Sequence, residues 1–308
     1  MKIVFMGTPE FAVPCLKRLI NDGHDVVGVF TQPDKPKGRG YTLTPPPVKE
    51  IAIENNIIVF QPIKLKDGEA FDILKKLNPE LIIVVAYGKI LPLDILELPQ
   101  FGCINIHASI LPRYRGAAPI QWSVINGDKK TGVTSMYMEQ GLDTGDMLIT
   151  GETDIGKNET AGELHDRLSL MGADVLSETI KKLQNGELSR KKQDDSLSTY
   201  SPMLDKSLCP LDWNETAQTI HNKIRGLSPW PVATALFDGK ILKIHESVVS
   251  EQQGSKPGEV VASDKSLVVS CGDGKCIEIL QLQAQGSKKM SAQDFLRGHK
   301  IEKGSILK

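Results

Sequence analysis

The residues best suited to chemistry in this sequence are Asn105 and His107, which lie in the otherwise apolar segment Cys-Ile-Asn-Ile-His. Side chains two residues apart project from the same face of a β-strand, so a strand here places both on one face. An amide can donate a hydrogen bond to an oxygen, and an imidazole exchanges a proton near neutral pH. Such a pair at the end of a strand can hold a carbonyl group and handle a proton. A histidine at a strand end can equally be structural, so the pair alone leaves the chemistry open.

A third candidate, Asp143, lies in the segment Gly-Leu-Asp-Thr-Gly-Asp at 141–146, after a strand that we expect at 131–139. Two glycines that bracket an aspartate let the backbone approach a ligand closely. A carboxylate beside an imidazole favours the imidazolium form and fixes the orientation of the ring. Asp143 is therefore either the partner of His107 or an ordinary turn residue.

Apolar strands alternate with helices through the first half of the chain, and this pattern predicts a parallel sheet covered by helices on both faces. The expected strands span 2–6, 25–31, 58–60, 81–86, 102–107 and 131–139. The expected helices span 11–21, 48–54, 69–77, 118–126 and 159–183. In such a sheet, ligands bind beyond the carboxyl ends of the strands.

Two of these strand ends are informative about the ligand. The first strand ends in Gly-Thr-Pro-Glu-Phe, without the Gly-x-Gly-x-x-Gly pattern that admits a dinucleotide pyrophosphate, which disfavours nicotinamide chemistry. The strand at 81–86 continues into Tyr-Gly-Lys-Ile-Leu-Pro at 87–92. This segment can line a slot for a flat heterocycle, or it can be an ordinary strand-to-helix turn.

The second half of the chain changes character after a polar run at 187–206. A short helix at 215–224 precedes short strands at 232–237, 240–245, 258–262, 266–270 and 277–282, a spacing that predicts a small barrel of the OB type. We therefore expect an α/β fold with a Rossmann-like, mostly parallel sheet and helices on both faces, followed by a small OB-like β-barrel. The expected domains are a catalytic domain at 1–189, a linker at 190–206 and a C-terminal domain at 207–308.

Size and composition narrow the class of protein. The 308 residues, 40% hydrophobic and 24% charged, suit a two-domain globular protein. The apolar runs are too short to cross a bilayer and the N-terminus does not resemble a signal peptide, so we expect a cytoplasmic protein without a membrane partner. The odd count of five cysteines argues against a disulfide framework. Cys271 and Cys276 flank an Asp-Gly turn signal, which favours a hairpin over a metal site, and no metal is expected.

The net charge of −1 does not indicate a DNA partner, but the charge is unevenly distributed. Residues 190–308 hold 17 Lys and Arg against 14 Asp and Glu, a net charge of +3, which leaves −4 for residues 1–189. A basic C-terminal part is compatible with a polyanionic partner. Chance asymmetry on solvated faces explains the difference equally well.

Taken together, Asn105, His107, the loop at 109–112 and the segment at 141–145 resemble the signature of 10-formyltetrahydrofolate-dependent formyltransferases. The resemblance implies that Asn105, His107 and Asp143 are catalytic and that 10-formyltetrahydrofolate is the co-substrate. The folate-binding residues that it implies come from three segments: Tyr87, Gly88, Ile90, Leu91, Ser109, Ile110, Leu111, Pro112, Gly141 and Asp143.

The segment at 31–49 is rich in Gly, Pro and cationic residues, and by itself is either a phosphate-contacting loop or a solvated surface loop. Together with Gly-Thr-Pro-Glu-Phe-Ala in the first strand and Ser-Pro-Trp-Pro at 228–231, it resembles the methionyl-tRNA formyltransferases, which act in translation initiation. That resemblance implies initiator methionyl-tRNA as acceptor, contacted by Lys35, Lys37 and Arg39. From its basic charge balance, we expect the C-terminal domain to bind the tRNA as well. We expect a monomer. The alternative is a formyltransferase acting on a nucleotide-linked amino sugar, which would share the catalytic residues but would need no basic loop.

Overall fold

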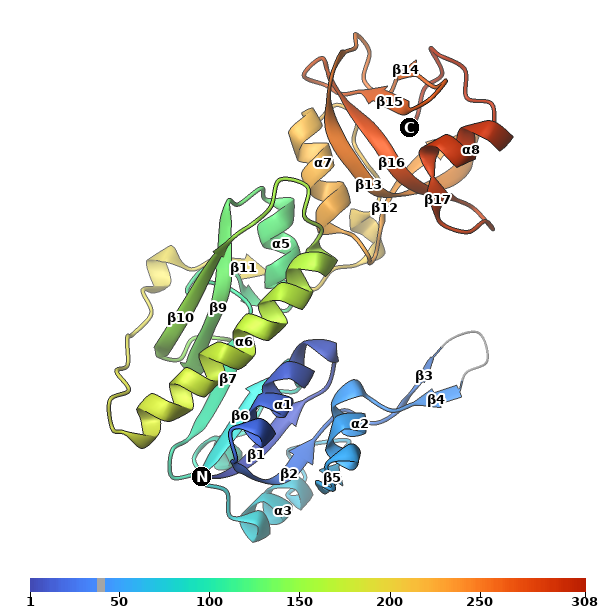
Figure 1. The fold of residues 1–308 in the computed structure, drawn as a ribbon. Helices are drawn as coiled ribbons and strands as arrows, with labels where there is room; N and C mark the ends of the chain where they lie inside the picture. Colours follow the sequence, from blue (N-terminus) through green and yellow to red (C-terminus); the bar gives the residue numbers. More distant parts are fainter. Residues whose placement is uncertain (38–41) are drawn as a thin grey trace. The chain divides into compact units, whose positions relative to one another are not determined.

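The computed structural model describes residues 1–37 and 42–308 (Figure 1). The chain forms two compact units, each built from three segments of the sequence. The first unit consists of Met1–Gly116, Gly132–Thr153 and His165–Tyr200, and the second of Ala117–Thr131, Asp154–Leu164 and Ser201–Lys308. No helix of the described residues is long and apolar enough to span a membrane.

The first unit is built on a seven-stranded sheet in the order β10-β9-β7-β6-β1-β2-β5. Its strands are β1 (Lys2–Gly7), β2 (Asp25–Phe30), β5 (Val59–Phe60), β6 (Leu81–Val85), β7 (Cys103–His107), β9 (Lys130–Tyr137) and β10 (Met147–Asp154). The pairs β1–β2, β1–β6, β6–β7 and β2–β5 are parallel, whereas β7 and β9 are antiparallel. The prediction of a mostly parallel sheet is confirmed.

Helices cover both faces of this sheet. They are α1 (Val13–Asn21), which follows the short 3₁₀ turn η1 (Glu10–Ala12), and α2 (Pro47–Glu54), α3 (Glu69–Leu77), α4 (Leu93–Leu96) and α6 (Ala161–Gln184). On one face, Gly172 of α6 lies so close to Ile106 of β7 that a Cβ there would be 3.2 Å from the Ile106 Cγ2 atom. On the other face, Cys103 of β7 shares a buried cluster with Leu74 of α3 and Ile95 of α4. Figure 1 shows α1 and α6 on the same side of the strands.

This alternation determines which face of β7 carries the polar side chains. Because Ile104 and Ile106 point toward the α1/α6 face, Asn105 and His107 point with Cys103 toward the opposite face. The parallel strands β1, β2, β5, β6 and β7 end at one edge of the sheet, so residues that follow these strands meet there.

The second unit contains a six-stranded antiparallel sheet that curls into a half-barrel, which confirms the predicted OB-like domain. Its strands are β12 (Ala233–Phe237), β13 (Lys240–Gln253), β14 (Val260–Ala262), β15 (Leu267–Ser270), β16 (Lys275–Ala284) and β17 (Met290–Ser291). Its helices are α5 (Pro119–Ile125), α7 (Ala217–Gly226) and α8 (Ala292–Gly298). Cys271 and Cys276 flank the tight β15–β16 connection, as the hairpin interpretation predicts.

Several elements differ from those expected. Strand β13 extends well past residue 245, because register shifts after Ile244 bend it and allow it to continue pairing with β16. Strand β10 and helix α4 were not predicted, since β10 is an edge strand with a largely polar sequence and α4 has only four residues. The predicted loop at 31–49 contains a short antiparallel pair, β3 (Lys35–Lys37) and β4 (Thr42–Thr44). The remaining short elements are β8 (Arg115–Gly116), β11 (Tyr200–Ser201), η2 (Asp195–Leu197) and η3 (Lys206–Leu208).

Candidate active site

His107 is the last residue of β7, and both of its ring nitrogens face oxygen atoms. The Nε2 atom lies 2.9 Å from the carbonyl oxygen of Tyr114, and the Nδ1 atom lies 3.7 Å from the Oδ2 atom of Asp143. A carbonyl oxygen can only accept, so Nε2 carries a hydrogen. Nδ1 then faces the Asp143 carboxylate. The side chain is 7% exposed, and these contacts fix its orientation.

Asp143 lies in the connection between β9 and β10, in a left-handed backbone conformation with φ +53°. Its Oδ2 atom also accepts a hydrogen bond from the backbone N–H of Gly116 at 2.9 Å. Gly145 brings this loop against β9, because a Cβ at that position would lie 1.9 Å from the carbonyl oxygen of Tyr137. The close approach explains why the second glycine of the segment is needed, and it holds the carboxylate beside the imidazole.

Gln193 forms hydrogen bonds to the Asp143 loop, although it lies in the segment at 190–206 that was expected to be a linker. Its Nε2 atom donates to the carbonyl oxygens of Asp143 and Gly145, both at 2.8 Å. Its Oε1 atom accepts from Nε and Nη2 of Arg115, which also forms an ion pair with Asp195. Gln193 is 6% exposed. No signal in the sequence marks Gln193, because a lone glutamine in a polar run without periodicity does not differ from a solvated residue.

Asn105 lies two residues before His107 and is half-buried. Among the described residues, its side-chain amide has no hydrogen-bond partner. The amide group is therefore available as a donor on the face of β7 that also carries His107. The predicted pairing of an amide with an imidazole on one strand face agrees with this arrangement.

The loop that follows β7 has a tightly held backbone. Thr134, which lies opposite His107 on β9, donates from Oγ1 to the Ser109 carbonyl oxygen at 2.7 Å and accepts from the Leu111 N–H at 3.3 Å. The Ser109 hydroxyl donates to the Arg113 carbonyl oxygen at 2.6 Å. The peptide between Leu111 and Pro112 is cis. The side chains of Ser109 and Leu111 are buried, whereas those of Ile110 and Pro112 are partly exposed.

The segment after β6 is held in a similar way. The Gln32 side chain donates from Nε2 to the carbonyl oxygens of Tyr87 and Gly88, at 3.1 and 3.2 Å, and Thr8 donates to the same Tyr87 oxygen. The Tyr87 ring is buried in the core, where burial raises the pKa of its hydroxyl. Ile90 is 76% exposed, while Leu91 is buried. Of the predicted folate-binding residues in this segment, two are therefore exposed: Gly88, which can contact a ligand through its backbone, and Ile90, which can contact it through an apolar side chain.

Two of the three predicted tRNA-contacting lysine and arginine residues lie on β3. Lys35 is exposed on β3, and Lys37 ends the same strand. Arg39 lies outside the described residues. Gly141 is exposed at the start of the Asp143 loop. The first unit thus gathers Asn105, His107 and Asp143 at one strand end, with the other predicted ligand contacts on neighbouring loops.

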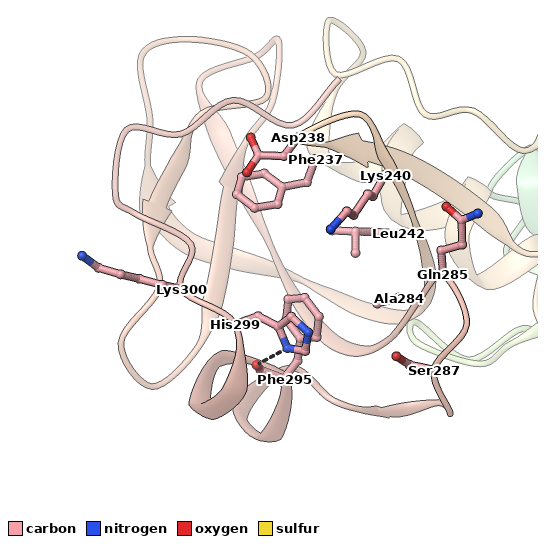
Figure 2. A pocket seen from close by; sticks show the side chains of 10 residues that line it. All are labelled: Phe237, Asp238, Lys240, Leu242, Ala284, Gln285, Ser287, Phe295, His299 and Lys300. Atoms are coloured by element: carbon pink, nitrogen blue, oxygen red, sulfur yellow. Dashed lines mark hydrogen bonds between the residues drawn. The ribbon is translucent and has the colours of Figure 1, made fainter.

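The second unit has a pocket of about 280 Å³ that contains none of the predicted site residues (Figure 2). The Phe295 and His299 rings stack at its wall with their centroids 4.3 Å apart. The lining residues are Phe237, Asp238, Lys240, Leu242, Ala284, Gln285, Ser287, Phe295, His299 and Lys300. Across the described part of the chain, no group of three His, Cys, Asp or Glu side chains could hold a metal ion.

Comparison with known proteins identifies the family of the chain. Residues 1–180 match the family model described as formyl transferase, and residues 203–300 match the one described as formyl transferase, C-terminal domain. The chain is 53% identical to the methionyl-tRNA formyltransferase of Clostridium novyi over 100% of both chains. The chain belongs to the methionyl-tRNA formyltransferase family. The family member from Geobacter metallireducens is also 53% identical, over 99% of this chain and 97% of its own length.

Solved structures show how far this fold extends beyond the methionyl-tRNA formyltransferase family. An N-formyltransferase from Helicobacter canadensis, in complex with folinic acid and dTDP-3-aminofucose, superposes with a TM-score of 0.71 at 21% identity. The match covers 92% of this chain and 99% of that one. At this identity the likeness establishes the fold alone. The chain is therefore assigned to the methionyl-tRNA formyltransferases by its full-length identity of 53%, and the N-formyltransferase is a distant structural neighbour.

Proposed function

We propose that this chain transfers the formyl group of 10-formyltetrahydrofolate to the α-amine of methionyl initiator tRNA. The observation that carries the proposal is the placement of His107 between the Tyr114 carbonyl oxygen and the Asp143 carboxylate. The side-chain amide of Asn105, which has no hydrogen-bond partner among the described residues, lies on the same strand face. Membership of the methionyl-tRNA formyltransferase family supports the choice of acceptor.

The proposed reaction begins when the neutral amine attacks the formyl carbon. A C–N bond forms, and the formyl oxygen takes up negative charge in a tetrahedral intermediate. Asn105 donates a hydrogen bond to that oxygen, and a protonated His107 adds positive charge beside it. When the intermediate collapses, the bond to the folate nitrogen breaks, and the proton lost by the amine is passed to that nitrogen. Asp143 orients the imidazole and shares in this proton transfer.

We assign folate binding to the three loops around this strand end. Gly88 and Ile90 after β6, Ile110 and Pro112 after β7, and Gly141 before Asp143 are exposed or partly exposed and can line a slot. In the same proposal, Tyr87, Leu91, Ser109 and Leu111 shape the slot from beneath, because their side chains are buried. The catalytic domain is 1–189, the linker is 190–206, and 207–308 binds tRNA.

In this proposal, Lys35 and Lys37 of β3, together with Arg39, contact the acceptor end. A basic extension at the strand ends suits an acceptor with many phosphates, such as tRNA, and a small acceptor would not require it. Replacing Arg39 with Ala should weaken the use of methionyl-tRNA while folate binding is retained. An equal loss of folate affinity would contradict this assignment. In the same proposal, the chain acts as a cytoplasmic monomer.

One assay distinguishes the candidate acceptors. The purified protein is supplied with 10-formyltetrahydrofolate and, in separate reactions, with methionyl-tRNA, a nucleotide-linked amino sugar or no acceptor. The proposal requires a formylated product with methionyl-tRNA alone. Product only with the amino sugar would establish the alternative, and product with neither acceptor would refute both.

A further inference from the structure

A hydrogen-bonded cluster outside the predicted site lies at the base of the β3–β4 pair. It consists of Gln32, Asp34, Lys49 and Gln61, which we call the root cluster. The Lys49 Nζ atom lies 2.9 and 2.8 Å from the two carboxylate oxygens of Asp34 and 2.8 Å from Oε1 of Gln61. Asp34 immediately precedes β3, and Lys49 lies in the first turn of α2, soon after β4. Both ends of the pair are therefore joined at one point.

Gln61 connects this ion pair to the end of β2. Its Nε2 atom lies 2.8 Å from the Gln32 carbonyl oxygen, 2.8 Å from Oδ1 of Asp34 and 3.1 Å from the Thr31 hydroxyl. Its amide oxygen must face Lys49, because an ammonium group can only donate and a carboxylate can only accept. Both ends of the Gln61 side chain are thus used, and neither leucine nor glutamate could replace it.

Gln32 carries the network onward to the proposed folate slot. Its side chain donates to the carbonyl oxygens of Tyr87 and Gly88, and its backbone N–H donates to the Thr8 hydroxyl at 3.2 Å. Lys89, which follows Gly88, contacts the two residues after Gln61. Its ammonium group donates to the Ile63 carbonyl oxygen at 2.7 Å and also to that of Pro62. The root cluster and the backbone of the proposed folate slot are therefore joined in one network of hydrogen bonds.

The position of the cluster suggests what it contributes. The side chains of Asp34 and Lys49 are 29% and 21% exposed, and ion pairs this exposed add little to folding stability. The ion pair nevertheless has a defined geometry, because the Lys49 ammonium group contacts both carboxylate oxygens of Asp34 and also Gln61. An interaction of this kind determines the direction of an attached segment more than it determines stability.

We propose that Asp34, Lys49 and Gln61 are positioning residues that hold the β3–β4 pair in place beside the folate slot and thereby set the affinity for the tRNA acceptor. The inference rests on the proposed function, since it takes the β3–β4 pair as the part that contacts tRNA. It assigns these residues no contact with the reacting atoms.

The test is steady-state kinetics of Lys49→Met, which removes the cation and nearly preserves the length of the side chain. We expect the KM for methionyl-tRNA to rise about tenfold, while kcat and the KM for 10-formyltetrahydrofolate stay within about twofold. Lys49→Arg keeps the charge and should recover most of the loss. Backbone amides at 42–44 should exchange with deuterium faster in Lys49→Met than in the wild-type chain.

Arg18→Met is the matched control, because Arg18 forms an ion pair with Asp22 and Asp174 elsewhere on the first unit. It should leave both KM values unchanged. An unchanged KM for tRNA in Lys49→Met, or an equal rise in both KM values, would overturn the inference. If the wild-type chain does not formylate methionyl-tRNA, the proposed function fails instead, so the two failures are distinguishable.

Discussion

Gln193 provides the sharpest test of how the site is held together. Replacing it with Ala removes two donors, to the carbonyl oxygens of Asp143 and Gly145, and the acceptor used by Arg115. A polar group left buried without a partner costs about 1–3 kcal/mol, so two carbonyl groups cost about 2–6 kcal/mol if the loop stays in place. The loop can relieve part of this cost by moving away from Gln193. Such a movement would carry Asp143 away from His107.

We expect Gln193→Ala to lose about 2 kcal/mol of transition-state stabilisation, which corresponds to about a 30-fold fall in kcat/KM. The assay is formyl transfer to methionyl-tRNA, with thermal unfolding followed in parallel. Gln193→Glu tests the direction of the hydrogen bonds. It keeps an acceptor for Arg115 but replaces the two donated bonds with a charge facing carbonyl oxygens, so it should be at least as damaging.

Ser196→Ala is a suitable control, because Ser196 lies in the same polar run but is exposed. It should behave as the wild-type chain in both measurements. If Gln193→Ala remains folded and retains wild-type kcat/KM, the Asp143 loop does not depend on Gln193. The reasoning that links the loop position to the rate would then be refuted.

Three further predictions address separate parts of the structure. Asn105→Ala should lower kcat by about 10²–10³ with tRNA affinity nearly kept, as expected for the loss of an oxyanion donor, and near-normal turnover would remove Asn105 from the mechanism. Gly145→Ala should lower the melting temperature and the activity together, since its Cβ would lie 1.9 Å from the Tyr137 carbonyl oxygen; a variant that melts and turns over like the wild type would show that the loop tolerates the methyl group. Burial lowers the pKa of His221 below its usual 6.5, and nearby Arg225 lowers it further, although a backbone hydrogen bond to Lys157 acts in the opposite direction. The unfolded chain therefore takes up a proton that the folded chain does not as the pH falls below about 6.5, and the free energy of unfolding should decrease there. Urea unfolding between about pH 7 and pH 5 should show a flatter dependence for His221→Asn, and an equally steep one would exclude His221 as the cause.

Local patterning was enough to predict most of the fold. The apolar runs of β1, β2, β6 and β7 indicate strands because only a sheet covered on both faces buries such runs. Helix α3 has the predicted bounds, and α6 ends at Gln184, one residue past the predicted end, just before an Asn-Gly pair whose Gly186 has φ +71°. The elements that were not predicted, such as β10 and α4, have weak hydrophobic patterns in the sequence. Strand β10 is an edge strand that alternates exposed and partly buried residues, and its polar sequence does not differ from that of a loop.

The candidate site could be predicted only in part. Asn105 and His107 are visible in the sequence because two polar residues interrupt a buried strand in strict alternation. Asp143 is visible because glycines bracket it. The partners that hold these residues, among them the Tyr114 carbonyl oxygen and the Gly116 N–H, are backbone groups that every residue carries, so no residue type marks them.

The sequence by itself determined that an amide and an imidazole share one face of a strand, since that follows from the two-residue period of the backbone. It also determined membership of the formyltransferases, through motifs spread along the chain. Only the tertiary structure decided that the Asp143 Oδ2 atom lies 3.7 Å from the His107 Nδ1 atom, and that Gln193 holds the loop that carries Asp143. Asp143 is 36 residues from His107, and Gln193 is 50 residues from Asp143. Contacts across such separations depend on how strands and loops pack, and no local pattern encodes them.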